Sequence, residues 1–207
     1  MTLTALQLGI YALGMAGLWA VPGPVWVALL ARSLSGGFAA AWPLAVGVTL
    51  GDALWPALAI FGMGWVLSVW GDALHVLRLV AAVIFVAMGI LLIRKSGALM
   101  KPDSRMTKPG VLPGFLTGVA AVIGNPKAIL FYMSVLPGFF GDLSKLTAPD
   151  ILSVMAVSVT VPLVGNLMLA GFLARVRGLL ASAHRVQLLN RISGVLLILV
   201  GCVIPFV

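Results

Sequence analysis

Six long apolar runs, separated by short polar gaps, occupy most of this 207-residue chain. They are Leu3–Leu30, Phe38–Val69, Leu74–Ile93, Val111–Phe140, Ile151–Leu173 and Leu188–Val207. A helix needs about 20 apolar residues to cross a bilayer. Only 9% of the residues are charged and the mean hydropathy is +1.19, whereas soluble domains carry about a quarter charged residues. The pattern predicts an all-α membrane protein of about six transmembrane helices, with no room for a soluble catalytic domain.

Ten of the 13 Lys and Arg residues lie in or next to the gaps after the first, third and fifth runs. They are Arg32, Arg94, Lys95, Lys101, Arg105, Lys108, Arg175, Arg177, Arg185 and Arg191. The positive-inside rule places these gaps in the cytoplasm, so both termini are predicted to lie outside. Because the net charge of +8 is spread over short gaps and gathers on no single wetted face, the sequence does not indicate nucleic-acid binding.

A polar, basic stretch at residues 94–110, with Pro102 and Pro109, divides the chain into two halves, 1–93 and 111–207. Each half is predicted to hold three helices, so two similar halves would enter the membrane with opposite topology, as in many secondary transporters. The first helix of each half carries a helix-breaking element, Pro22-Gly23-Pro24 or Gly124-Asn125-Pro126. We therefore expect two inverted three-helix halves joined by a cytoplasmic linker.

Asp52 lies about fifteen residues into the second run, close to the expected centre of the bilayer. A carboxylate at this depth costs a few kcal/mol unless it is paired, hydrated or protonated. One interpretation is a proton-coupling or amine-binding site, and the alternative is a structural hydrogen bond between helices. Function is favoured, because an uncharged Asn would serve packing at a lower cost.

Lys127 is also expected at depth, directly after Asn125 and Pro126 in the fourth run. Its long stem could carry the ammonium group back to the interface. Alternatively it pairs with Asp52, which is the only acid at comparable depth, and a zwitterionic solute would break and remake that pair. Both interpretations remain open from the sequence.

The two proline elements are expected to interrupt their helices and to leave backbone carbonyls unbonded. In lipid such groups are tolerated where they line a cavity or are covered by protein. Freed carbonyls can hold an ammonium group, and the N-terminus of a half-helix can hold a carboxylate. Pro22, Gly23, Pro24, Asn125 and Pro126 are therefore predicted to serve the two ends of an amino acid, with plain kinks as the alternative.

Other polar residues add little chemistry. Asn166, four residues after Pro162 on the same helical face, either lines the transport path or bonds a neighbouring helix. The chain has no Glu, a single Cys202 and two isolated His, so no catalytic, metal or cofactor site is expected. The prediction is a small-solute exporter and not an enzyme. A metal-ion exporter of the same topology is the alternative, although it would need several carboxylates, His or Cys at depth.

Several short stretches occur in order along nearly the whole chain. They are Val21–Val25, Ala31–Ser33 with Gly36, Gly47–Asp52, Gly124–Phe131, Leu136–Phe139 and Asn190–Gly194. Together they resemble the lysine-exporter family, also called LysE/RhtB, of bacterial inner-membrane amino-acid exporters. The Pro-Gly-Pro and Asn-Pro-Lys elements at this separation are the most specific part of the resemblance.

The resemblance implies efflux of amino acids or related small zwitterions, driven by the proton-motive force. It also implies a six-helix, inverted-repeat arrangement in the bacterial inner membrane, a dimer, and an amino-acid-like substrate, protons and lipid as partners. Two features depart from the family pattern. Gly165-Asn166 stand where an aromatic residue is common, which implies a smaller and more polar cavity there, and Asp103 is the only acid of the linker.

Overall fold

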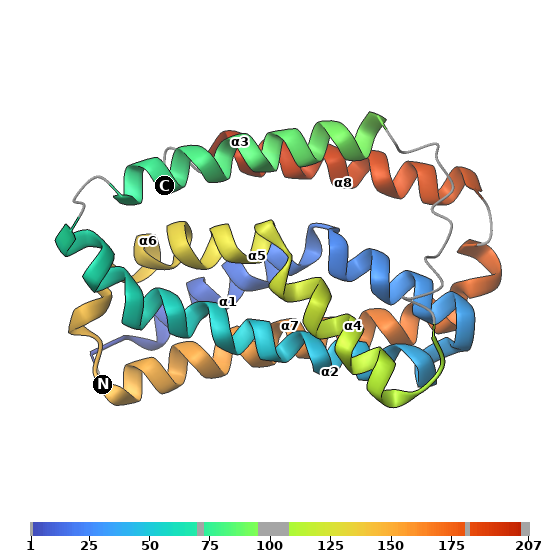
Figure 1. Cartoon of the computed structure of the whole chain (residues 1–207), viewed down its shortest axis with the longest axis horizontal. Helices are drawn as coiled ribbons and strands as arrows, with labels where there is room; N and C mark the ends of the chain where they lie inside the picture. Colours follow the sequence, from blue (N-terminus) through green and yellow to red (C-terminus); the bar gives the residue numbers. More distant parts are fainter. Residues whose placement is uncertain (1, 70–72, 95–107, 181–182, 204–207) are drawn as a thin grey trace.

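The computed structural model describes residues 2–69, 73–94, 108–180 and 183–203, and its regular structure within these ranges is entirely helical (Figure 1). The elements are α1 (Ala5–Ala20), α2 (Pro24–Val69), α3 (Ala73–Arg94), α4 (Val111–Ile123), α5 (Pro126–Leu130), the π-helix η1 (Phe131–Val135), α6 (Leu136–Phe140), the 3₁₀-helix η2 (Leu143–Lys145), α7 (Ala148–Leu180) and α8 (Ala183–Val203). The all-α prediction is confirmed. Most of the predicted linker, with Pro102 and Asp103, lies outside the described residues.

Helix α1 begins with a capping box. The Thr4 hydroxyl accepts a hydrogen bond from the Gln7 backbone N–H, and the Gln7 side chain accepts one from the Thr4 N–H at 2.9 Å. The helix ends at Ala20, just before Pro22, which has no N–H to continue it. A new helix starts at Pro24. The first apolar run therefore forms two helical pieces separated by a break at residues 21–23.

Helix α2 turns sharply at Gly36 and Gly37. Gly37 has φ +67°, a backbone region that favours glycine. Figure 1 shows the ribbon running to one end of the molecule and then returning beside itself. The Arg32 guanidinium bridges the turn, since its Nε donates to the Ala40 carbonyl at 2.5 Å. Its terminal nitrogens donate to the carbonyls of Lys108 and Gly110, both at 3.1 Å, where the second half of the chain begins.

The second predicted break is also present. The helical stretches Val111–Ile123 and Pro126–Phe140 meet at an angle of 49°, and Gly124 and Asn125 lie between them. The Asn125 side chain caps α5 by accepting from the Lys127 N–H at 3.1 Å, and Pro126 occupies the first helical position, where its missing N–H costs nothing. The first apolar run of each predicted half is thus interrupted at its proline element.

Helix α2 forms the centre of the bundle, packing against both α4 and α7, while α1 packs on α7 and α3 pairs with α8 (Figure 1). Glycines allow α2 and α4 to cross closely. A Cβ atom added at Gly47 would overlap the Phe115 carbonyl, and one at Gly118 would overlap the Leu44 carbonyl. Only glycine at these two positions permits the observed crossing.

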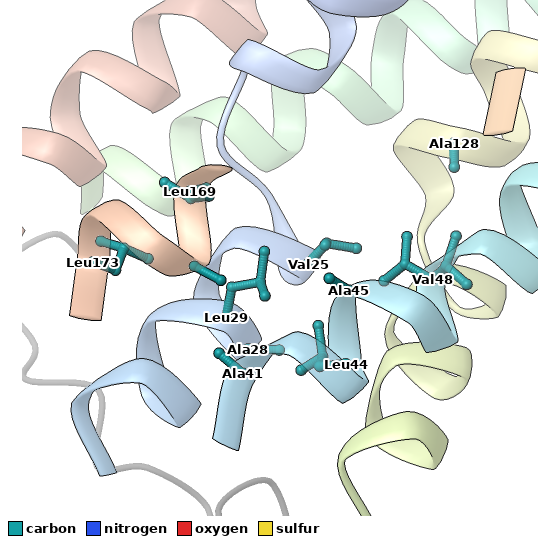
Figure 2. Close-up of a cluster of buried hydrophobic side chains, with 12 residues drawn as sticks. Val25, Ala28, Leu29, Ala41, Leu44, Ala45, Val48, Ala128, Leu169 and Leu173 are labelled. Carbon is teal, nitrogen blue, oxygen red and sulfur yellow. The ribbon is translucent and has the colours of Figure 1, made fainter. Parts of the chain in front are cut away.

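The core beside this crossing comes from segments far apart in sequence. Figure 2 shows Ala28 and Leu29, before the α2 turn, close to Ala41 and Leu44, after it. Leu169 and Leu173 of α7 complete the cluster from another side. Large apolar side chains also cover the outer surface, as with Leu13, Phe61, Leu152 and Met168. An outer surface this apolar is suited to lipid.

Two helices of the described structure are long and apolar enough to cross a membrane, Pro24–Gly62 and Ala148–Val176. A third crossing results if Val111–Ile123 and Pro126–Phe140 are taken as one bent span. Shorter apolar helical stretches occur at Ala5–Ala20, which is α1, and at Ala82–Leu91 within α3. The six spans in two inverted halves predicted from the sequence therefore remain a prediction.

Candidate functional site

A pocket of about 50 Å³ lies where the two helix breaks approach α2 and α7. Its lining is mostly apolar with a few polar groups, and comprises Met15, Leu18, Trp19, Val25, Trp26, Val48, Asp52, Val122, Asn125, Lys127, Ala128, Tyr132, Pro162 and Asn166. Four of the predicted site residues, Asp52, Asn125, Lys127 and Asn166, are among them. The structure brings these four together from α2, the α4–α5 break, α5 and α7.

The other predicted residues, Pro22, Gly23, Pro24 and Pro126, do not line the pocket but shape the backbone beside it. Pro22 and Gly23 lie in the α1–α2 break, and Pro24 and Pro126 open the helices that follow the two breaks. Gly23 faces the stem of Lys127, since a Cβ atom there would lie 3.6 Å from Lys127 Cε. These residues therefore position the site without lining it.

Lys127 extends into the protein, away from the surface, and the residue is only 6% exposed. Its Nζ donates to the carbonyls of Leu18 at 2.9 Å and Val21 at 2.5 Å, at the break between α1 and α2. The carbonyls that the sequence assigned to a substrate ammonium are thus bonded by this internal ammonium. An ammonium has three N–H donors, so one remains beyond these two carbonyls.

Asp52 is equally buried, with 6% exposed, but its bonding differs. Its Oδ2 atom has no hydrogen-bond partner, and among the buried side-chain polar atoms of the described residues only the Ser33 hydroxyl shares this condition. Asp52 and Lys127 both lie within the described ranges. They interact electrostatically but are too far apart for a direct ion pair. Buried polar atoms are nearly always bonded, so a bare carboxylate oxygen in a pocket marks a place for a ligand or a proton.

Asn166 lines the pocket and also bonds a neighbouring helix. Its Oδ1 accepts a hydrogen bond from Trp19 Nε1 at 3.0 Å. Trp26 Nε1 in turn donates to the Trp19 carbonyl at 2.8 Å, and the two indole rings lie 5.6 Å apart. This aromatic wall was not predicted from the sequence, although Trp19 and Trp26 flank the Pro-Gly-Pro element closely.

A hydroxyl cluster next to the pocket was also missed. Tyr132 lines the pocket and its hydroxyl donates to the Ser158 carbonyl at 3.4 Å, while the Tyr11 hydroxyl lies 2.6 Å from Ser158 Oγ. All three residues are buried. They come from α1, η1 and α7, so no local sequence pattern could have grouped them.

The site can do one thing chemically with the groups present. Asp52 offers an acceptor for a cation or a proton, and Lys127 offers a donor for an anion, within one small pocket. Among the residues that the structure describes, no three His, Cys, Asp or Glu lie together as a metal site would require.

Comparison with known proteins agrees with the motifs. The profile of the LysE type translocator family matches residues 16–205. An uncharacterised membrane protein of Synechocystis is 29% identical over 185 residues, which cover 88% of this chain and 87% of that protein. No solved structure matches the chain significantly.

Two named efflux proteins match more locally. The threonine efflux protein of Escherichia coli K12 is 32% identical over 113 residues, covering 50% of this chain and 52% of that protein. The leucine efflux protein of Salmonella choleraesuis is 28% identical over 142 residues, covering 67% and 64%. The match thus spans only about half the length of the threonine efflux protein.

The family match covers most of the chain, including both helix breaks and all four pocket residues predicted from the sequence. It confirms the resemblance to this family that the motifs of the sequence indicated. The chain therefore belongs to the LysE type translocator family and is a membrane transporter, not an enzyme.

Proposed function

We propose that this protein exports amino acids or related small zwitterions across the bacterial inner membrane, and that Asp52 couples export to protons. The observation that carries the proposal is the unpartnered Asp52 Oδ2 in the same buried pocket as the Lys127 ammonium. The names of the relatives, which export threonine and leucine, support amino acids as the substrate class.

A zwitterion complements the two charges of the pocket. Its ammonium group binds the free oxygen of Asp52, and its carboxylate binds the remaining donor of Lys127. A carboxylate buried without a partner is costly, so Asp52 binds a proton when the pocket holds no substrate. Substrate and proton then compete for one carboxylate, which is the simplest basis for exchanging them across a membrane.

We further propose six crossings arranged as two inverted halves. The packing of the helices supports this arrangement, because α1 contacts α7 in the way that α4 contacts α2. A two-fold relation that exchanges α2 with α7 and α3 with α8 would also leave the α2–α7 and α3–α8 contacts unchanged. The presence of a proline break in α1–α2 and in α4–α5 fits the same relation.

The proposed orientation places both termini outside and the residues around Lys108 in the cytoplasm, on the basis of the charge distribution. In a Cys202→Ser background, a membrane-impermeant thiol reagent should label Ser144→Cys in intact cells. It should label Lys108→Cys only after the membrane is opened. Labelling of Lys108→Cys from outside would reverse the orientation. A dimer, which the resemblance implies, is part of the proposal.

The test of function is transport by the purified protein in lipid vesicles, with a panel of amino acids and with or without a proton gradient. We expect gradient-dependent transport of at least one amino acid, and its loss in Asp52→Asn at normal protein content. Asp142→Asn is the matched control, because it neutralises an exposed acid whose ion pair with Lys145 lies at the surface. Transport by Asp52→Asn at the wild-type rate would refute the coupling role.

A further inference from the structure

Trp19 is packed directly on the backbone of α7 at Gly165. A Cβ atom added at Gly165 would lie 2.5 Å from Trp19 Cε2 and 2.8 Å from its Nε1. Real side chains do not approach this closely, so any larger residue at position 165 would push the indole away from α7. The missing side chain of Gly165 thus creates the space that the indole occupies beside the pocket.

The indole is also fixed in direction. Its Nε1 donates to Asn166 Oδ1 at 3.0 Å, from the residue next to Gly165, while the Trp26 indole donates to the Trp19 carbonyl. Shape and hydrogen bonding both hold Trp19 in one position. A large aromatic side chain held in this way is a rigid wall of the pocket, unable to rotate aside for a larger solute.

The charge and size of the pocket restrict what it can accept. Its charged lining residues are one acid and one base, Asp52 and Lys127, which match the two ends of a zwitterion. A second charge on the substrate would find no partner there, and an unpaired buried charge is costly. The pocket is small, with a volume of about 50 Å³, so it favours a zwitterion with a short side chain.

We propose that the pocket selects zwitterions with a short, uncharged side chain, and that Trp19, held by Asn166 over Gly165, sets the upper limit of side-chain length. This inference rests on the proposed function and adds the substrate class. Small-to-large discrimination by a rigid apolar wall amounts to about tenfold or more for each added carbon or two. The wild-type protein should therefore transport alanine at least about tenfold faster than leucine, and lysine not at all.

Two substitutions should move this preference in opposite directions. Trp19→Phe removes the outer ring and the Asn166 bond, so the leucine-to-alanine rate ratio should rise about tenfold. Gly165→Ala displaces the indole and should lower the leucine-to-alanine rate ratio below the wild-type value. A merely structural role for Trp19 would reduce both rates together and leave the ratio unchanged.

Each variant has a matched control. Trp42→Phe makes the same change at an exposed position of α2, and Gly9→Ala adds a methyl group in α1 where no atom lies within 4 Å. Rates of labelled alanine, leucine and lysine are measured for all five proteins in vesicles. If Trp19→Phe does not accumulate, Gly165→Ala alone tests the inference, because it is the variant predicted to lower the leucine-to-alanine rate ratio.

The results separate the two proposals. Equal or faster transport of leucine or lysine by the wild type overturns the selectivity inference, as do ratios in Trp19→Phe and Gly165→Ala that equal those of their controls. Neither result affects the proposed export of amino acids. Failure of the wild type to move any amino acid in the panel refutes the proposed function, and the selectivity inference falls with it.

Discussion

Two buried carboxylates of this protein are treated in opposite ways. Asp150, at the start of α7, accepts hydrogen bonds from the backbone of Thr2 at 2.9 Å, of Leu3 at 3.0 Å and of Thr147 at 3.0 Å. The hydroxyls of Thr2 and Thr147 bond it as well. Asp52, in the middle of α2, has an oxygen with no partner at all.

The contrast distinguishes an acid with a structural role, Asp150, from one that is free to bind a ligand or proton, Asp52. The five donors around Asp150 satisfy its charge completely and tie the N-terminal segment to the first turn of α7, where a carboxylate is also favoured by the helix dipole. Nothing further can bind there. Asp52, in contrast, is a buried acid with an oxygen that no protein group bonds. Such an acid is suited to a ligand or proton that binds and dissociates.

The largest expected effect concerns the pocket. Lys127→Met removes the donor for the substrate carboxylate and the nearest opposite charge to Asp52, so transport should fall at least about 100-fold, equivalent to about 2.7 kcal/mol. The rate is measured in vesicles at equal protein content. Lys145→Met is the control, because that ammonium is exposed.

Combining Lys127→Met with Asp52→Asn sharpens this prediction. If the two residues act on the two ends of one substrate, the double variant should be little worse than either single variant. Losses that multiply would mean that the residues act independently, and the common site would be wrong.

A smaller effect is expected at the clasp around Asp150. Asp150→Ala leaves its donors without an acceptor, so the free energy of unfolding should fall by about 2 kcal/mol. Transport for each folded molecule should be unchanged. Asp52→Asn should do the reverse, with stability within about 1 kcal/mol of the wild type and transport lost. Denaturant titration in detergent and vesicle transport, done on both variants, check the pair; equal destabilisation would break the contrast.

The smallest effect involves the exposed Asp142, which provides a reference for both buried acids. The Ser144 hydroxyl donates to its carboxylate at 2.6 Å, and this bond, with the Ser144 N–H and Lys145, lowers the pKa of Asp142. A lowered pKa means that the carboxylate stabilises the folded loop above the usual Asp range and loses that effect as the pH falls through the lowered value. Ser144→Ala should raise the pKa of Asp142 toward its ordinary value, as seen by carboxyl NMR of Asp-labelled protein. Ser153→Ala, whose hydroxyl bonds only the Pro149 carbonyl, should leave it unchanged.

Much of the fold could be predicted from the sequence, because apolar length and proline chemistry act locally. The run Leu74–Ile93 corresponds closely to α3, Ala73–Arg94, and both proline elements break their helices. The gap predicted after the first run proved to be a glycine turn at residues 36 and 37 inside α2. No composition signal distinguishes such a turn from a loop.

The composition of the site was predicted better than its bonding. Asp52 and Lys127 stood out because charge is rare in apolar runs. Their partners depend on contacts between distant segments, since Lys127 bonds the Val21 carbonyl from 106 residues away and Trp19 bonds Asn166 from 147 residues away. From the sequence, the freed carbonyls were predicted to bind the ammonium group of a substrate. The fold shows that the Lys127 ammonium bonds them instead.

The Arg32 guanidinium has a consequence for how the protein is assembled. It bonds the turn of the first half to the carbonyls of Lys108 and Gly110. The start of the second half is therefore attached to the first half by these hydrogen bonds as well as by the covalent chain. The glycine crossing of α2 with α4 and the pairing of α3 with α8 join the same two halves. The covalent link between Arg94 and Lys108 is then one connection among several. Two fragments expressed separately should therefore associate and reconstitute the transporter.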